Sequence, residues 1–365
     1  MNRKNTNSAV RTALIAGAVL ASAATMAAPA SATETIKLTM LSGYPQLAAW
    51  TGAAVETFIP DVDAALAKTG NYKIDWNVAI AGQVVKATGE IEGIENQLGD
   101  IGIAVTAAAP DKAPLYAISF NTPFTTLDMT LLSDTMKSLT EQFPAYAADW
   151  ESLNQVALYP ASAVDNMMVW TDKKTTKLSE LEGVKIGAIG PNLRWVQPIG
   201  AIGINTDLVR AYNGLSTGVF NGVIFWPAAA GQFKLCEPAP YALEADIGAV
   251  SGFSLNVNRD SWESLPEEVR NAFAAAAPKW KDSTVARVKK VTDIMVNKCV
   301  KEYGTEFTKL TDAERKQWAM SLPPLGKEWA SQRDAAGAPG TEILKVYMDT
   351  MRAANQPIAR NWDVE

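Results

Sequence analysis

The chain has 365 residues, of which 48% are hydrophobic and 20% are charged, with 24 glycines, 19 prolines and 11 tryptophans. This composition argues against a disordered chain, a collagen and a bundle of membrane helices, and the length is typical of about two domains. The sequence contains no histidine, so the formal net charge of −6 does not depend on histidine titration. Mechanisms that use histidine as a catalytic base are excluded.

The first 32 residues have the pattern of an export signal. Three basic residues precede an apolar run over residues 13–24 that is too short to span a bilayer, and Ala-Ser-Ala at 30–32 matches a small-residue cleavage site. We therefore expect cleavage near Ala32 and a mature chain in the periplasm.

Removal of this signal makes the chain more acidic. It takes away three positive charges and no negative ones, which leaves 30 basic and 39 acidic residues and a net charge of −9. Such a chain is not expected to bind nucleic acid or an anionic membrane surface. No later run has the apolar length of a membrane helix, so we expect no membrane insertion.

Short apolar strands alternate with amphipathic helices in the first part of the mature chain. The pattern predicts strands at 35–41, 73–79 and 100–105, with helices at 50–67 and 84–98. This β-loop-α-β order is typical of an α/β sheet, in which ligands bind beyond the carboxyl ends of the strands.

A second block repeats the same order. Strands are predicted at 155–159, 166–171 and 184–188, and a Gly-Pro-Asn loop then leads into a helix at 194–199. A further helix, turn and strand follow over residues 210–224. Two α/β blocks predict two lobes with a ligand cleft between them.

From residue 260 onward the pattern is almost wholly helical, and residues 279–303 form a helix long enough to run across both lobes. The predicted organisation is a signal peptide at 1–32, lobe I at 33–155, lobe II at 156–248, and a crossover strand back to lobe I with a helical region spanning both lobes at 249–365.

Cys236 and Cys299 are the only cysteines. In an oxidising compartment they can pair as a disulfide, and their spacing matches no metal motif. Two separately buried thiols fit the sequence equally well, because the sequence does not give the distance between the two Cα atoms.

Motifs of enzymes are absent or incomplete. Residues 214–218 match Gly-x-Ser-x-Gly, but Ser216 has no histidine to activate it and is interpreted as part of a helix end and turn. Glu90, Glu92 and Glu95 fit one helix and are expected to face water near its start. We therefore predict no catalytic residue, no metal site and no cofactor; an exported enzyme that uses carboxylates is the alternative from another class.

Four segments, in this order behind an export signal, resemble the extracytoplasmic solute receptors of TRAP transporters, of the DctP type. They are the Gly-Gln turn, helix and Gly-Asp-Ile strand at 81–102, and the segments at 179–186, 212–222 and 256–269. The resemblance covers roughly residues 35–351. It implies a two-lobed periplasmic-binding-protein-like α/β fold without catalytic activity, a monomer or dimer, which closes on a small solute and delivers it to membrane-embedded permease subunits.

Two departures from the family concern the ligand carboxylate. The family usually has an arginine directly after Lys-Ile that forms a two-pronged salt bridge with this carboxylate, but that position here is Gly187. Arg194, seven residues later, is expected to take this role; the alternative is a surface arginine that caps its own helix turn. A second family arginine would fall near Asn166, which offers an amide instead.

A third departure adds aromatic rings. Where the family commonly has asparagine before proline, this chain has Phe225 and Trp226, and the Trp226 ring can stack on a flat or apolar ligand. Tyr44 and Trp195 are further candidate binding residues. The predicted solute is a small organic acid or related anion with an apolar or aromatic portion; a neutral or cationic solute in an aromatic site is the alternative.

Overall fold

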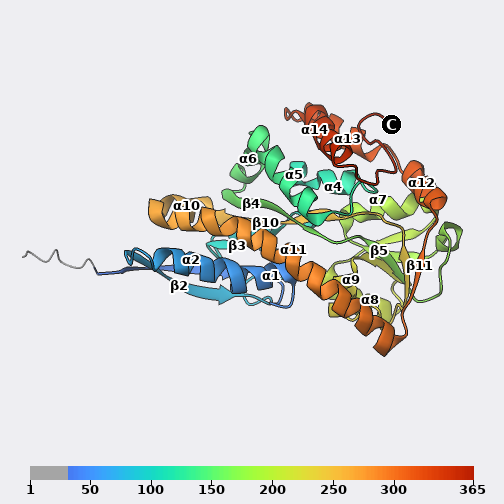
Figure 1. The fold of residues 1–365 in the computed structure, drawn as a ribbon, viewed down its shortest axis with the longest axis horizontal. Helices are drawn as coiled ribbons and strands as arrows, with labels where there is room; N and C mark the ends of the chain where they lie inside the picture. Colours follow the sequence, from blue (N-terminus) through green and yellow to red (C-terminus); the bar gives the residue numbers. More distant parts are fainter. Residues whose placement is uncertain (1–31) are drawn as a thin grey trace, which may run out of the picture. The chain divides into compact units, whose positions relative to one another are not determined.

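A computed structural model describes residues 32–365 (Figure 1). Residues 1–31, on which the expected export signal falls, lie outside the described part. No helix of residues 32–365 combines the length and the apolar character needed to cross a membrane.

The first sheet has five strands in the order β2-β1-β3-β10-β4. Their bounds are β1 (Glu34–Leu41), β2 (Tyr72–Ala79), β3 (Ile101–Val105), β4 (Gln155–Val164) and β10 (Val250–Asn258). β1, β2 and β3 run parallel, and β10 is antiparallel to β3 and to β4. The carboxyl ends of β1, β3 and β4 and the amino end of β10 therefore lie at one edge of the sheet.

The second sheet has six strands in the order β11-β9-β5-β8-β6-β7. Their bounds are β5 (Met168–Thr171), β6 (Lys185–Ala188), β7 (Ile202–Asn205), β8 (Gly222–Phe225), β9 (Tyr241–Glu244) and β11 (Glu306–Lys309). β6 runs parallel to β7 and β8, whereas β5 is antiparallel to β8 and β9. We refer to the halves built on the first and second sheets as lobe I and lobe II.

One predicted assignment differs from the structure. The sequence pattern starts lobe II at residue 156, but β4 pairs with β10 from Gln155 to Val164 and so belongs to the first sheet. The region after residue 260 is almost wholly helical, as expected, and its short strand β11 pairs with β9. Alternation of apolar residues predicts a strand but does not show which strand it pairs with, because that strand lies far away in the sequence.

Helices cover both sheets. Their bounds are α1 (Ala49–Ala53), α2 (Ile59–Leu66), α3 (Glu90–Glu95), α4 (Ile118–Asn121), α5 (Met129–Gln142), α6 (Ala145–Glu151), α7 (Leu193–Val196), α8 (Leu208–Ser216), α9 (Pro227–Gln232), α10 (Arg259–Ser264), α11 (Glu267–Tyr303), α12 (Asp312–Ser321), α13 (Leu325–Ala335) and α14 (Gly340–Ala353). The helix predicted over 84–98 is shorter than expected, since only α3 forms there and turns with positive φ at Gly82 and Thr88 precede it.

The helix α11 joins the two lobes along their side. It has 37 residues, which corresponds to about 55 Å at the usual rise per residue. It packs against α1, α2 and β4 of lobe I and against α9 of lobe II, and Figure 1 shows it running diagonally past both.

A disulfide fastens α11 to lobe II. Cys236, just after α9, is bonded to Cys299 near the end of α11, with the Cα atoms 5.8 Å apart. Both side chains are fully buried. This pairing decides between the two alternatives that the sequence left open.

Replacing both cysteines with alanine is expected to lower the free energy of unfolding by about 2–4 kcal/mol, because the bond restricts the unfolded chain. Urea unfolding without reductant measures this loss. The reduced wild type provides the control and should unfold like the double variant. Equal stability of the oxidised wild type and the variant would contradict the prediction.

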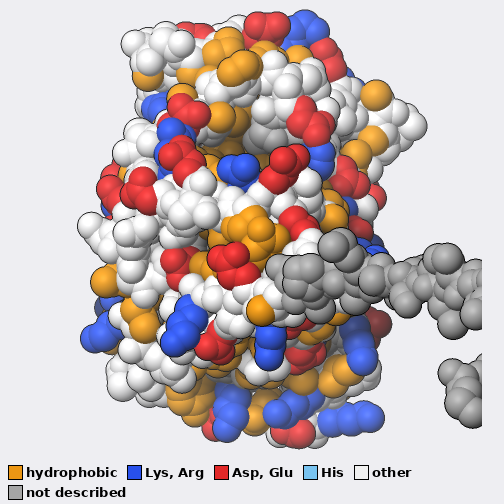
Figure 2. Space-filling view, turned by 90° about the vertical axis from the view of Figure 1, so that its left-hand side faces the viewer, with side chains coloured by type: hydrophobic (Ala, Val, Ile, Leu, Met, Phe, Trp, Pro, Cys, Tyr) orange, Lys and Arg blue, Asp and Glu red, His pale blue; other side chains and the backbone are white. Residues whose placement is uncertain are grey.

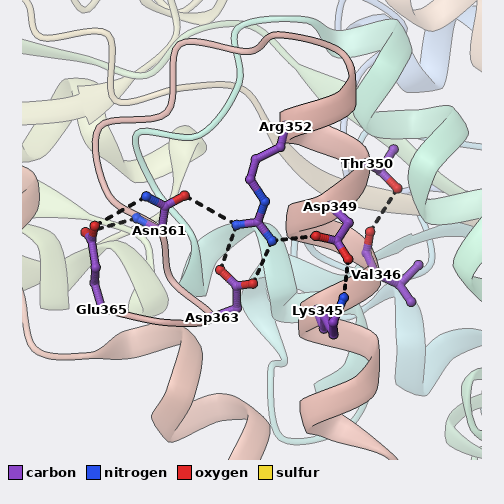
Figure 3. Close-up of polar contacts among 8 residues, drawn as sticks. All are labelled: Lys345, Val346, Asp349, Thr350, Arg352, Asn361, Asp363 and Glu365. Atoms are coloured by element: carbon purple, nitrogen blue, oxygen red, sulfur yellow. Dashed lines mark hydrogen bonds and ion pairs between the residues drawn. The ribbon is translucent and has the colours of Figure 1, made fainter.

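Polar contacts fasten the C-terminal segment to α14 (Figure 3). The Arg352 guanidinium contacts Asp349 and Asp363, in each case with Nη2 2.7 Å from a carboxylate oxygen. These two carboxylates raise the pKa of Arg352 above its usual value. Next to them, the Trp362 ring is fully buried and its N–H donates to the Pro123 carbonyl at 2.7 Å. The segment after α14 is thereby held against lobe I.

Figure 2 shows the end of the molecule at which α2 and α10 lie. Acidic and basic side chains are interspersed over this face rather than gathered by sign. The face shown therefore has no continuous basic surface of the kind that nucleic acid requires.

Candidate ligand-binding site

A narrow cavity lies where the strand ends of the two lobes meet. It is lined by Tyr44, Trp50, Val105, Ala107, Phe120, Val164, Met167, Ile189, Leu208, Phe225, Trp226, Val250, Gly252 and Phe253. The lobe I residues follow or end β1, β3 and β4 or begin β10, and the lobe II residues lie at the carboxyl ends of β6, β7 and β8. This is the edge at which an α/β sheet is expected to bind ligands.

Six of the fourteen residues that line the cavity are aromatic. The Trp50 ring stacks on Phe253 with ring centres 3.8 Å apart, and Tyr44 meets Trp50 edge-on at 5.1 Å. The Trp226 ring, from the other lobe, lies 6.1 Å from that of Trp50. The cavity measures about 30 Å³, room for a few water molecules at most. A solute with a ring therefore needs the walls to move apart before it can bind.

Three of the six predicted site residues line this cavity, namely Tyr44, Phe225 and Trp226. Tyr44 is placed by the loop after β1, where the Ser42 hydroxyl accepts its backbone N–H. Gly43 permits this loop, because a Cβ there would lie 2.2 Å from the backbone nitrogen of Ala87. Trp226 directly follows β8 and precedes the proline that starts α9.

Trp195 lies behind the wall rather than in it. Its ring is fully buried and stacks on Phe120 at 6.1 Å, and its N–H donates to the Phe120 carbonyl at 2.9 Å. It therefore supports a lining residue, and the structure does not bring it to the cavity.

Asn166 lies in a connection between the lobes. Its amide donates to Asp246 Oδ1 at 3.1 Å and its carbonyl oxygen accepts the Gly248 N–H at 3.0 Å. Residues 165–167 join β4 to β5, and residues 245–249 join β9 to β10, so these bonds hold the two connections together. Both polar groups of this amide are thus bonded within the connections between the lobes.

Arg194 is also outside the cavity. Its guanidinium pairs with Glu328 of α13, and 41% of its side chain is exposed to solvent. The expectation that Arg194 holds a ligand carboxylate therefore has no support from its position, because an acidic partner on a distant segment already occupies it.

Arg194→Ala is expected to leave solute affinity unchanged and to lower the free energy of unfolding by no more than about 1 kcal/mol, since an exposed ion pair stabilises little. Calorimetry and urea unfolding measure the two quantities. Glu328→Gln breaks the same pair and should behave alike. A loss of affinity of about 100-fold for Arg194→Ala would show instead that the guanidinium reaches the solute.

A buried carboxyl group lies beside the cavity. Glu90, at the start of α3, is fully buried, in contrast to the solvent-facing position predicted for it. Its Oε1 accepts the Gly43 N–H at 2.9 Å, while Oε2 has no partner within residues 32–365. Burial raises the pKa of Glu90 to about 7.

The same surroundings keep Tyr44 protonated. Burial, together with the negative charges of Glu90 and Asp207, raises the pKa of the Tyr44 hydroxyl above its usual value. Asp207 is paired with Arg210, Nε to Oδ2 at 2.6 Å. No lysine, arginine, aspartate or glutamate belongs to the cavity lining itself. Within residues 32–365 no group of three or more acidic or cysteine side chains is placed to hold a metal ion.

Sequence reasoning does not single out Trp50, Phe120 and Phe253. The position of Trp50 could have indicated a site residue, because it begins the predicted helix that follows the first predicted strand, at the edge where an α/β sheet binds ligands. Phe253 lies within β10, and no local pattern shows which end of that strand meets the cavity.

The profile of bacterial extracellular solute-binding protein family 7, DctP, matches residues 53–332. The chain belongs to the DctP family. Over 135 residues, 37% of its length, it is 28% identical to the C4-dicarboxylate-binding periplasmic protein DctP of Rhodobacter capsulatus. That match spans only 40% of the relative's length.

Solved structures of TRAP receptors share the fold of this DctP-family protein. A TRAP periplasmic solute-binding protein from Bordetella bronchiseptica with bound mandelate has a TM-score of 0.76 at 19% identity, covering 87% of this chain and 99% of the other. A marine metagenome TRAP solute-binding protein in complex with 3-hydroxybenzoate has a TM-score of 0.76 at 17% identity, and the match covers 89% of this chain and 100% of the other. A Bordetella pertussis receptor binding pyroglutamic acid has a TM-score of 0.72 at 20% identity, and the match covers 86% of this chain and 99% of the other. The predicted two-lobed α/β fold is confirmed.

The DctP-family protein has no room for an arginine at the position after Lys185-Ile186. A Cβ on Gly187 would lie 2.9 Å from the Phe220 ring, which also packs closely over Gly214. Gly187 is buried within β6. The Phe220 packing thus excludes the side chain that the family resemblance implies there.

Proposed function

We propose that the protein is the periplasmic receptor of a TRAP transporter. It captures one small organic solute with an aromatic or apolar ring between its lobes and delivers it to the membrane permease. The observation that carries this proposal is the cavity at the junction of both lobes, walled by six aromatic side chains. Its family membership supports the same role.

Binding follows from differential affinity for two arrangements of the lobes. Both lobes supply rings to the cavity, so a solute gains its full set of contacts only when the lobes are closed. The connections at 165–167 and 245–249, held together by Asn166, are the positions where backbone rotation can separate the lobes. The permease then distinguishes the closed, loaded receptor from the open, empty one.

The structural relatives suggest an organic acid or related anion with a ring as one solute class. Structurally similar receptors carry mandelate and 3-hydroxybenzoate, each of which combines an aromatic ring with a carboxylate. The aromatic wall around Trp50, Phe253 and Trp226 suits the ring of such a solute.

A neutral or cationic solute is the second candidate. It is favoured by one observation, the lack of any lysine or arginine among the lining residues. An exported enzyme has less support, because no pair of carboxylates lines the cavity either.

Thermal unfolding of the protein, refolded to strip any retained solute, tests the proposal against a library of aromatic, alicyclic and aliphatic acids, amines and neutral compounds. At 100 times its Kd a specific solute stabilises the folded state by about 2.7 kcal/mol, and at least one ring-bearing compound should do so. An unchanged melting temperature with every compound would contradict the receptor function.

A further inference from the structure

Most tryptophans in this chain donate their indole N–H to the protein. Seven of the eleven do so, namely Trp76, Trp170, Trp195, Trp280, Trp318, Trp329 and Trp362, at 2.7–3.0 Å. Trp50 and Trp150 differ, because each has a buried Nε1 with no acceptor within residues 32–365, and only 2% of Trp50 is exposed. Trp50 lines the solute cavity, and its ring is held in place by stacking on Phe253.

An unpaired buried N–H lowers stability unless something accepts its hydrogen bond, and such groups are rare in native structures. The lining side chains include no carboxylate, amide, serine or threonine, and the hydroxyl of Tyr44 is not bonded to this donor. A bound solute with an acceptor can satisfy it in place of water. A solute with a hydrogen-bond acceptor therefore suits this cavity better than a purely apolar one.

The charges around the cavity indicate that this acceptor is not a carboxylate. Neither arginine of the family clamp is present, because Gly187 and Asn166 stand at the two positions. Gly187 is covered by Phe220, and the Asn166 amide is bonded to Asp246. Arg194 is paired with Glu328. An ionised solute would lose its hydration without gaining a cationic partner, which is strongly unfavourable.

The acidic groups beside Tyr44 point in the same direction. Glu90 is buried next to this end of the cavity, and Asp207 lies close enough for its charge to affect the Tyr44 hydroxyl. Arg210 offsets the charge of Asp207 but not that of Glu90. A second anion in this position would be repelled.

We infer that the receptor selects an uncharged, ring-bearing solute whose carbonyl or ether oxygen accepts the Trp50 indole N–H, in preference to a carboxylate. This inference rests on the proposed receptor function and names the solute class of the same cavity. The aromatic wall binds the ring, and the Trp50 N–H orients the polar end.

Nearly isosteric compounds separate charge from shape. We expect acetophenone to bind at least 10-fold more tightly than benzoate at pH 8, and cyclohexyl methyl ketone more tightly than cyclohexanecarboxylate, by calorimetry. Tighter binding of either carboxylate, or of phenyltrimethylammonium, would overturn the inference and leave the receptor function standing. Failure of every compound in this set and in the wider library would overturn both.

Trp50→Phe tests the donor itself, since phenylalanine keeps a ring on Phe253 but has no N–H. Acetophenone affinity should fall about 3- to 10-fold, the loss expected for one neutral hydrogen bond, while ethylbenzene, which has no acceptor, should bind as before. Trp76→Phe removes an indole N–H that is bonded to Asp63 away from the cavity, and should alter neither affinity. Equal losses for acetophenone and ethylbenzene in Trp50→Phe would overturn the assigned hydrogen bond.

Discussion

Trp226→Ala is expected to lower solute affinity at least about 30-fold and to lower the free energy of unfolding of the empty protein by about 3 kcal/mol. Only 6% of this side chain is exposed, and its ring lies between those of Phe225 and Trp50. Its removal therefore takes away both a cavity wall and buried apolar contact. Calorimetry with the most stabilising solute and urea unfolding of the empty protein measure the two effects.

Trp226→Leu provides the matched control, because leucine keeps much of the apolar volume but has no π face. We expect it to recover most of the stability and only part of the affinity, with ring stacking contributing about 0.5–1.5 kcal/mol beyond burial. Normal affinity in the folded fraction of Trp226→Ala would show that this tryptophan is a core residue alone.

Glu90→Gln is expected to stabilise the protein by up to about 3 kcal/mol at pH 8 and by less than about 1 kcal/mol at pH 5. The pKa of this buried carboxyl is raised to about 7, above its value of 4.5 in the unfolded chain. Between pH 4.5 and about pH 7 the folded state binds more protons than the unfolded state, so the free energy of unfolding falls as the pH rises through this range. Glutamine retains an oxygen for the Gly43 N–H and has no charge to bury.

Urea unfolding of both proteins at pH 5 and pH 8 measures this difference. Glu92→Gln, on the same helix, is the control, because Glu92 is about half exposed and pairs with Lys112 at 2.8 Å. It should change stability by less than about 1 kcal/mol at either pH. The same gain for Glu90→Gln at both pH values would show that the buried carboxyl does not titrate near neutrality.

Local sequence patterns predicted several strands and part of the cavity. The strands β1, β2 and β6 begin and end within one or two residues of their predicted bounds, because apolar alternation and turn residues are local signals. Tyr44 and Trp226 were predictable as lining residues for a related reason. Both follow the carboxyl ends of strands, where an α/β sheet binds its ligands.

Tertiary structure alone decided which polar groups are free to meet a solute. Arg194 has the chemistry for a carboxylate, but its partner Glu328 lies on a helix far away in the sequence. Asn166 is similarly occupied by a segment that returns from lobe II. An ion pair or hydrogen bond between distant segments produces no local pattern from which a single sequence could predict it.

The same limit applies to burial and to strand pairing. Glu90 looks like a helix-start residue facing water, yet packing against the Gly43 loop buries it completely. β4 joins the first sheet because β10 returns to it from later in the chain. The amino-acid sequence therefore predicts many of the strands, the family and three residues that line the cavity. The lack of charged side chains in the lining and the unpaired N–H of Trp50 depend on how distant segments pack. Burial and hydrogen-bond partners are properties of the folded chain.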